Sequence, residues 1–153
     1  MTNFDNDLQI QLHDVARMLR TRFDRWARTY GLTRAQGVIL ARLNRQPGLS
    51  QIELAAICEV EPITVGRLVD RLEARGLIER RPDPADRRIR RLHLLPTSKT
   101  ILAKIETYKA DLDAWLLDGV SLEERQAMVN VLLRMKNKLN METSSGVLVV
   151  GGE

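Results

Sequence analysis

Apolar side chains recur at every third or fourth position along the first part of the chain, which is the spacing of one face of an α-helix. This stripe consists of Leu8, Leu12, Val15, Leu19, Phe23, Trp26 and Tyr30. Gly31 ends the predicted helix, because glycine readily adopts the conformation that closes a helix. The same period returns in two helices near the C-terminal end, over about 98–118 and 121–140, which Gly119 separates.

Shorter helices are predicted in the middle of the chain. Their starts are marked by capping boxes, in which a Ser or Thr and a Glu or Gln three residues later bond each other's backbone amides. The capping pairs are Thr33 with Gln36, Ser50 with Glu53 and, before the last helix, Ser121 with Glu124. Pro62 lies at an early helical position and Gly76 closes that helix. The predicted middle helices span 34–45, 51–58 and 62–75.

Beyond Gly76 the period changes to that of a β-strand. Residues 77–81 and 89–95 are predicted strands, and the Pro82-Asp83-Pro84-Ala85-Asp86 segment between them has the composition of a turn. The fold is therefore predicted to be mainly α with a small β-hairpin wing, an α+β arrangement. A short helix, a turn, a second helix and a hairpin in this order are typical of a winged helix-turn-helix. In that fold the second helix enters the DNA major groove.

The distribution of charge supports a polyanionic partner. The 24 Lys and Arg residues exceed the 20 Asp and Glu residues by four. Segment 75–91 alone holds seven arginines and three acids, a net charge of +4. Arginine binds phosphate through two parallel hydrogen bonds, which favours DNA as the partner. The alternative is a solvated charged face.

The helix from Pro62 is the predicted reading helix. Its core face is Val65, Leu68, Val69 and Leu72. Major-groove contacts are expected from Pro62, Ile63, Thr64, Arg67 and Arg71. Arg67 is the predicted base reader, because a guanidinium can donate two hydrogen bonds to guanine. Ile63 or the Thr64 methyl would meet a thymine methyl, although Ile63 could instead pack in the core.

Phosphate contacts are expected from Arg71 and from free backbone amides near Ser50 and Pro62. Ser50 and Gln51 are accordingly predicted to contact the DNA backbone. The wing is predicted to enter the minor groove through Asp86, Arg87, Arg88 and Arg90. Within it Asp86 would orient Arg88 through a bidentate ion pair. The alternative is that the segment is only a polar turn.

The stretch LSQIELAAICEVEPITVGRLVDRLEARGLIERRPDPADRR, from Leu49 to Arg88, resembles the MarR family of bacterial transcriptional regulators, and its SlyA-like branch in particular. The family's DRLE-x-x-GLI segment begins here at Asp70, and its D-x-x-DRR wing begins at Asp83. The flanking LTRAQGVIL and GVSLEERQAMVNVL segments match as well, so the resemblance covers about 8–140. One departure is Leu94-Leu95-Pro96-Thr97, where the family usually has Leu-Thr before the next helix.

The resemblance implies a homodimeric repressor or activator whose terminal helices interlock. The expected domains are an N-terminal dimerisation helix at 1–31, the winged domain at 32–97, dimerisation helices at 98–140 and a disordered tail at 141–153. The predicted dimer contacts are Leu8, Leu12, Val15, Trp115, Leu132 and Leu139. A two-fold dimer would place the reading helices roughly 34–36 Å apart on a pseudo-palindromic operator. The alternative is that the stripes pack on each other within one chain.

Relatives commonly bind small aromatic or phenolic acids, so the resemblance implies an effector of that class. The predicted pocket residues are His13, Arg17, Trp26 and Tyr30. For the aromatic residues the alternative is ordinary core packing.

Other functions receive little support from the sequence. Catalytic motifs are absent from it, so neither an enzyme nor a cofactor is expected. His13, His93 and Cys58 are too scattered for a metal site, and Cys58 is expected to be a structural thiol. We see no secretory signal and no membrane span, so a cytoplasmic location is expected. The alternative function is a helical protein-interaction adaptor with only non-specific DNA affinity.

Overall fold

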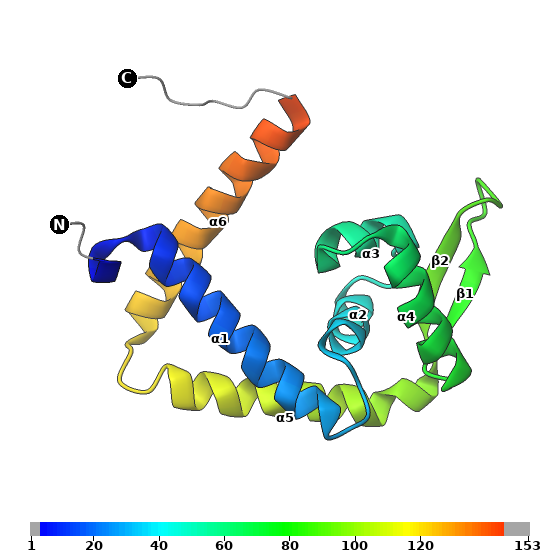
Figure 1. Ribbon diagram of the computed structural model, residues 1–153, viewed down its shortest axis with the longest axis horizontal. Coiled ribbons are helices and arrows are strands. Elements are labelled where there is room, and N and C mark those ends of the chain that lie inside the picture. Colours follow the sequence, from blue (N-terminus) through cyan, green and yellow to red (C-terminus); the bar gives the residue numbers. More distant parts are fainter. Residues whose placement is uncertain (1–3, 146–153) are drawn as a thin grey trace. The chain divides into compact units, whose positions relative to one another are not determined.

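The computed structural model describes residues 4–145 of the chain (Figure 1). The elements, in chain order, are a 3-10 turn (Phe4–Asn6), α1 (Leu8–Arg28), α2 (Arg34–Arg45), α3 (Gln51–Cys58), α4 (Pro62–Ala74), β1 (Ile78–Pro82), β2 (Arg90–Leu94), a 3-10 turn (Pro96–Ser98), α5 (Lys99–Leu116) and α6 (Leu122–Ser145). This order confirms the predicted fold class. The chain divides into two compact units, residues 1–109 and residues 110–153.

Local hydrogen bonds explain where the helices start. At α2 the Thr33 hydroxyl accepts from the Gln36 amide at 3.1 Å, and the Gln36 side chain accepts from the Thr33 amide at 3.0 Å. Equivalent reciprocal bonds form at Ser50 and at Ser121. All three predicted capping boxes are therefore present. The cap of α1 was not predicted: the Asp7 carboxylate accepts from the amides of two first-turn residues.

The core of the first unit lies among α2, α3, α4 and the hairpin. Its fully buried side chains include Leu32, Ile39, Leu40, Leu43, Leu54, Val65, Val69, Leu72, Ile78 and Leu92. Helix α1 contributes Ala27 to this core, and α5 contributes Leu102 and Ile105. Val65, Val69 and Leu72 confirm the predicted core face of α4, which fixes the opposite face outward.

The hairpin is an antiparallel pair in which Ile78 lies opposite Leu94 and Arg80 lies opposite Leu92. Segment 48–50 extends it, because the Leu92 amide donates to the Leu49 carbonyl and the Gly48 amide donates to the Leu92 carbonyl, each at 3.0 Å. The strands begin and end within one residue of the predicted limits. The wing is therefore hydrogen-bonded to the loop between α2 and α3.

The unusual junction after β2 is a short 3-10 turn. Its Ser98 hydroxyl donates to the Leu95 carbonyl at 2.7 Å, and its Thr97 hydroxyl donates to the Gly76 carbonyl. The unusual Leu94-Leu95-Pro96-Thr97 segment thus changes only the short connection before α5, which begins at Lys99.

In the second unit, α6 continues to Ser145, beyond the predicted end near 140. The predicted disordered tail was therefore wrong for residues 141–145, where good helix formers such as Met141 and Glu142 prolong the helix. The rest of that tail lies outside the described residues. Arg125 donates to the Leu117 and Val120 carbonyls in the loop between α5 and α6, at 2.6 and 3.0 Å. No helix within residues 4–145 is long and apolar enough to cross a membrane.

Candidate nucleic-acid interface

The outward face of α4 carries the residues predicted for the major groove. Pro62, Ile63, Thr64, Arg67 and Arg71 are all exposed. Ile63 exposes 69% of its surface, so the alternative in which it packs in the core is wrong. This leaves a helix that is anchored by one face and presents an apolar side chain, a hydroxyl and two guanidinium groups on the other.

The two outward arginines of α4 make no hydrogen bond or ion pair with any residue in the described part of the chain. Arg75, one turn beyond Arg71, behaves differently. Its guanidinium donates to the Gly31 carbonyl at 3.0 Å and to the Tyr30 carbonyl at 3.4 Å. Arg67 and Arg71 can therefore bind an external anion, whereas Arg75 satisfies carbonyls at the end of α1.

The wing tip is an ordered turn built on Asp83. One carboxylate oxygen accepts from the amides of Ala85 and Asp86, at 2.7 and 3.0 Å. The other accepts from Nε of Arg91 at 2.7 Å. The hydrogen bond from Arg91, followed by those from the two amides, holds the pKa of Asp83 below its usual value. The turn thus has a specific internal scaffold, beyond a polar composition.

Asp86 and Arg88 form the predicted bidentate pair. Nε and Nη2 of Arg88 each lie 3.0 Å from a different carboxylate oxygen of Asp86. The side-chain bond from Arg88 lowers the pKa of Asp86, and the same contact raises the pKa of Arg88. The Arg88 side chain nevertheless remains 90% exposed. Arg87 and Arg90 are also exposed, and neither side chain has a polar partner within residues 4–145.

Free backbone amides were predicted near Ser50, and the amide of Ser50 itself is not one of them. The capping box uses both groups of this residue: its amide donates to the Glu53 carboxylate at 2.7 Å, and its hydroxyl accepts from the Glu53 amide at 3.2 Å. The bond from the Ser50 amide is also the main reason that the pKa of Glu53 is lowered. Gln51 is similarly engaged, because its side-chain oxygen accepts from Arg80 at 3.0 Å.

The arginines that are available to an external anion are therefore not the same set as the arginines of segment 75–91. Within that cluster, five arginines bond other parts of the protein, namely Arg75, Arg80, Arg81, Arg88 and Arg91. Sequence reasoning missed the internal role of Arg80 and Arg91. A signal was present in the acids Asp70, Glu73 and Glu53, which lie outside the cluster and pair with it.

The predicted effector residues lie in two different settings. His13 and Arg17 are exposed on α1, where Arg17 pairs with Asp14 at 3.3 Å. Trp26 and Tyr30 belong to an aromatic cluster, with ring centroids 4.9 Å apart. Phe23 and Tyr108 complete this cluster, and the Tyr108 ring lies 4.7 Å from that of Trp26.

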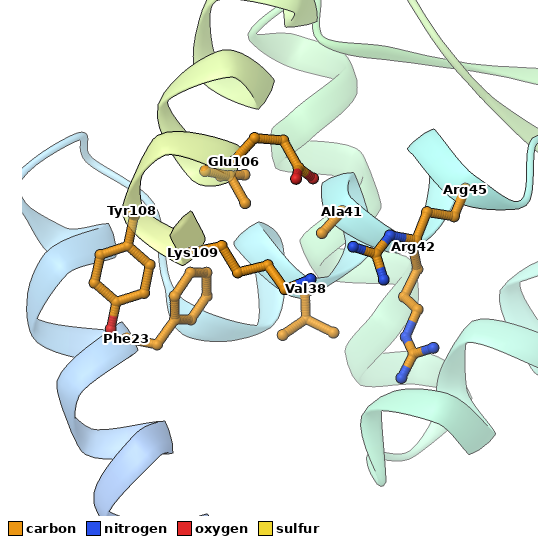
Figure 2. A pocket seen from close by; sticks show the side chains of 9 residues that line it. Phe23, Val38, Ala41, Arg42, Arg45, Glu106, Tyr108 and Lys109 are labelled. Carbon is orange, nitrogen blue, oxygen red and sulfur yellow. The ribbon is translucent and has the colours of Figure 1, made fainter. Parts of the chain in front are cut away.

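Besides an open groove of about 640 Å³ along α3 and the start of α4, two more enclosed cavities in the first unit are lined by other residues. The larger, of about 310 Å³, is lined by Phe23, Val38, Ala41, Arg42, Arg45, Ile105, Glu106, Tyr108 and Lys109 (Figure 2). The smaller, of about 180 Å³, is lined by Arg20, Arg34, Ala35, Val38, Ile57, Cys58 and Glu59. Burial raises the pKa of the Cys58 thiol, and the nearby Arg42 and Arg34 partly oppose this rise. None of the four predicted effector residues lines either cavity.

Comparison with known proteins gives consistent matches. The model of the MarR family matches residues 32–89. The structure of the transcriptional regulator PA3341 is 32% identical in sequence with a TM-score of 0.79, and the match covers 88% of this chain and 98% of that one. The structure of MarR is 28% identical with a TM-score of 0.79, over 95% and 99% of the two chains. The complex of MepR from S. aureus with DNA is 22% identical with a TM-score of 0.73, over 91% and 99%, and concerns the fold alone.

Proposed function

Because this chain belongs to the MarR family of transcriptional regulators, we propose that it binds double-stranded DNA sequence-specifically, as a homodimer on a pseudo-palindromic operator. Members of this family regulate transcription and are not enzymes. The observation that carries the proposal is the combination of an anchored α4 and a projecting wing. The side chains of Arg67 and Arg71 on α4, and of Arg87 and Arg90 on the wing, have no hydrogen-bond or ion-pair partner among residues 4–145. The solved complex of MepR with DNA supports the same use of this fold.

Helix α4 would read the major groove. Arg67, free of internal partners among residues 4–145, is suited to donate two hydrogen bonds to the O6 and N7 of guanine. The exposed Ile63 and the Thr64 methyl are suited to contact a thymine methyl. Pro62 would allow the first turn to approach the DNA, and Arg71 would bind phosphate.

The wing would enter the minor groove. A narrow minor groove concentrates negative potential and attracts guanidinium groups. Asp86 holds the exposed Arg88 in one direction, so less side-chain entropy remains to be lost on binding. Arg87 and Arg90 would add minor-groove or phosphate contacts. At α3 the side chains of Ser50 and Gln51 are engaged internally, so we assign the phosphate contact there to the first-turn amide of Gln51.

The exposed apolar side chains of α1, α5 and α6 favour a dimer. The predicted contacts Leu8, Val15, Trp115, Leu132 and Leu139 are all exposed, and Leu12 is half-buried. An apolar surface of this extent is typical of a protein–protein interface. A two-fold dimer would present two α4 helices roughly 34–36 Å apart, which matches adjacent major grooves on one face of DNA. Sedimentation of the purified protein tests this step directly.

The larger cavity is our candidate effector site. Arg42, Arg45 and Lys109 supply three cations against the single acid Glu106, while Phe23 and Tyr108 supply aromatic walls (Figure 2). This chemistry fits a small aromatic or phenolic acid. Trp26 and Tyr30 would support the pocket through the ring of Tyr108, whereas His13 and Arg17 do not line it. Benzoate should raise the melting temperature of the wild type more than that of Arg42→Gln/Arg45→Gln. Phenol, which has the ring but no carboxylate, should raise the melting temperature of the wild type less than benzoate does.

Assignment to the SlyA-like branch rests on the DRLE segment and the wing motif, and it is part of this proposal.

The decisive experiment selects bound duplexes from a random pool at near-physiological salt. We expect an inverted repeat whose half-sites lie about one helical turn apart. Arg67→Ala should then relax the base preference at one position of each half-site. An adaptor with only non-specific affinity would instead enrich no motif and would bind random and selected duplexes equally at one salt concentration.

A further inference from the structure

Arg80 has an unusual position on the wing. It lies on β1 directly opposite the fully buried Leu92, and it follows the buried Ile78 on the same face of the strand. This face packs against α4, where an apolar residue would be ordinary. Only 22% of the Arg80 side chain is exposed, so its charge and its five N–H donors need partners within the protein.

All three guanidinium nitrogens of Arg80 have such partners. Nη2 donates to the Asp70 carboxylate at 2.5 Å and to the Gly66 carbonyl at 3.3 Å, and Nη1 donates to the Glu73 carboxylate. Nε donates to the side-chain oxygen of Gln51 on α3 at 3.0 Å. Gly66, Asp70 and Glu73 are spaced four and three residues apart, so they form one row along α4. A single planar group thereby connects β1 with two helices.

No other side chain in the described residues hydrogen-bonds the wing to α4. Arg91, the second engaged arginine of the hairpin, connects β2 with Asp83, the Gly48 carbonyl and Glu53 instead. The Leu77 amide, just before β1, donates to the Leu72 carbonyl at 3.0 Å, and apart from this bond and those of Arg80 no further hydrogen bond joins the hairpin to α4 within residues 4–145. Apolar contacts do not fix direction as hydrogen bonds do. The orientation of the wing relative to α4 therefore depends strongly on Arg80.

We infer that Arg80 is a positioning residue, which sets the separation between the major-groove and minor-groove contacts without touching DNA. This inference rests on the proposed function, because it assumes that α4 and the wing bind one duplex together. Arg80 has no nitrogen left without a partner, so its effect on binding must pass through the elements that it connects.

The chain offers a matched control on the same strand. Arg81 pairs with Glu79, two residues away on β1, and this pair joins no second element. The variants Arg80→Gln/Asp70→Asn and Arg81→Gln/Glu79→Gln each remove one positive and one negative charge. Non-specific attraction to DNA is therefore equal in both, and only the first weakens the connection between wing and helix.

The test uses the selected operator and two derivatives, with one base pair inserted or deleted between the bases read by α4 and the minor-groove tract protected by the wing. We expect the wild type and the Arg81→Gln/Glu79→Gln protein to bind the altered duplexes roughly ten-fold more weakly than the operator, as for a displaced contact. Arg80→Gln/Asp70→Asn should bind all three duplexes within about three-fold of one another, because its wing can follow the tract.

A general loss of folded protein would lower the affinity for every duplex and leave these ratios unchanged. Equal ratios in all three proteins, or a wild type that tolerates the insertion, would overturn the inference. If the double variant does not fold, Arg80→Lys keeps the charge but loses the planar fork, and its ratio should fall between the two extremes. If the random pool yields no operator at all, the proposed function fails first, and the two failures are thus distinguishable.

Discussion

The division of arginines into engaged and unengaged groups predicts the salt dependence of DNA binding. Arg71 and Arg75 lie one turn apart at the end of α4, and the substitution Arg→Gln removes the same charge at either position. The Arg71 side chain has no polar partner within residues 4–145, whereas the Arg75 guanidinium donates to the carbonyls of Gly31 and Tyr30. Only Arg71→Gln should therefore remove a phosphate contact.

The expected magnitude follows from counterion release. Each phosphate contact adds about 0.9 to the slope of log affinity against log salt, so losing Arg71 from both protomers should lower the slope by about 1.8. Between about 0.05 and 0.2 M salt, the affinity of the wild type should then fall roughly twelve-fold more than that of Arg71→Gln. Arg75→Gln should keep the wild-type slope and lose up to about 1 kcal/mol of stability, because its hydrogen bonds lie in an exposed position.

Fluorescence anisotropy of a labelled operator at five or more salt concentrations measures the slopes, and thermal unfolding measures the stabilities. The reasoning is refuted if Arg75→Gln lowers the slope as much as Arg71→Gln does. That result would mean that the internal hydrogen bonds of Arg75 are exchanged for phosphate contacts on binding. An unchanged slope in both variants would exclude this end of α4 from the contact surface.

Three further predictions concern other parts of the chain. Ser50→Ala and Ser121→Ala each remove a capping box and should each cost about 1 kcal/mol, or about 2–8 °C in Tm, but only Ser50→Ala should also weaken DNA binding. The lowered pKa of Asp83 means that its carboxylate stabilises the fold above the unfolded value near pH 4, and that this stabilisation is lost as the pH falls through the folded value. Urea unfolding should therefore show Asp83→Asn to be less stable than the wild type at pH 7, with a difference that shrinks below about pH 4; a constant difference would count against the ion pair with Arg91. Cys58, whose pKa is raised by burial, should react with a thiol reagent at pH 7.5 more slowly than free cysteine, and unfolding should remove the difference; equal rates would contradict its burial.

Much of the fold could be predicted because the signals that define it are local. A capping box joins residues three positions apart, so Thr33, Ser50 and Ser121 mark helix starts wherever the rest of the chain goes. The limits of the strands depend on pairing between segments, and the observed limits differ from the predicted ones by one residue. Helix α6 exceeded its predicted length because the sequence beyond Asn140 contains no residue that stops a helix before Ser145.

The outward residues of α4 could also be predicted, since three buried positions fix one face of a helix and therefore the other. The cavity that we propose as an effector site could not be predicted. Trp26 and Tyr30 have helical spacing, which is the same for a residue in a core and a residue in a pocket. What separates these alternatives is the ring of Tyr108 on α5, and nothing in the local sequence of α1 indicates that contact.

Charge counting was misleading for a related reason. The net charge of segment 75–91 counts only the acids inside it, but Asp70, Glu73 and Glu53 lie outside and bond Arg80 and Arg91. The same total would result if every arginine of the segment faced DNA, so a charge sum does not distinguish a scaffold from a contact surface. The strand period does distinguish them, because alternate residues of a strand point to the same face. An arginine two residues from a core residue, as Arg80 is from Ile78, must find acceptors inside the protein. Here the acceptors are acids that lie four and seven residues after Gly66 on the preceding helix. In a related chain, such an arginine together with two such acids would indicate a wing that is held against α4 before DNA binds.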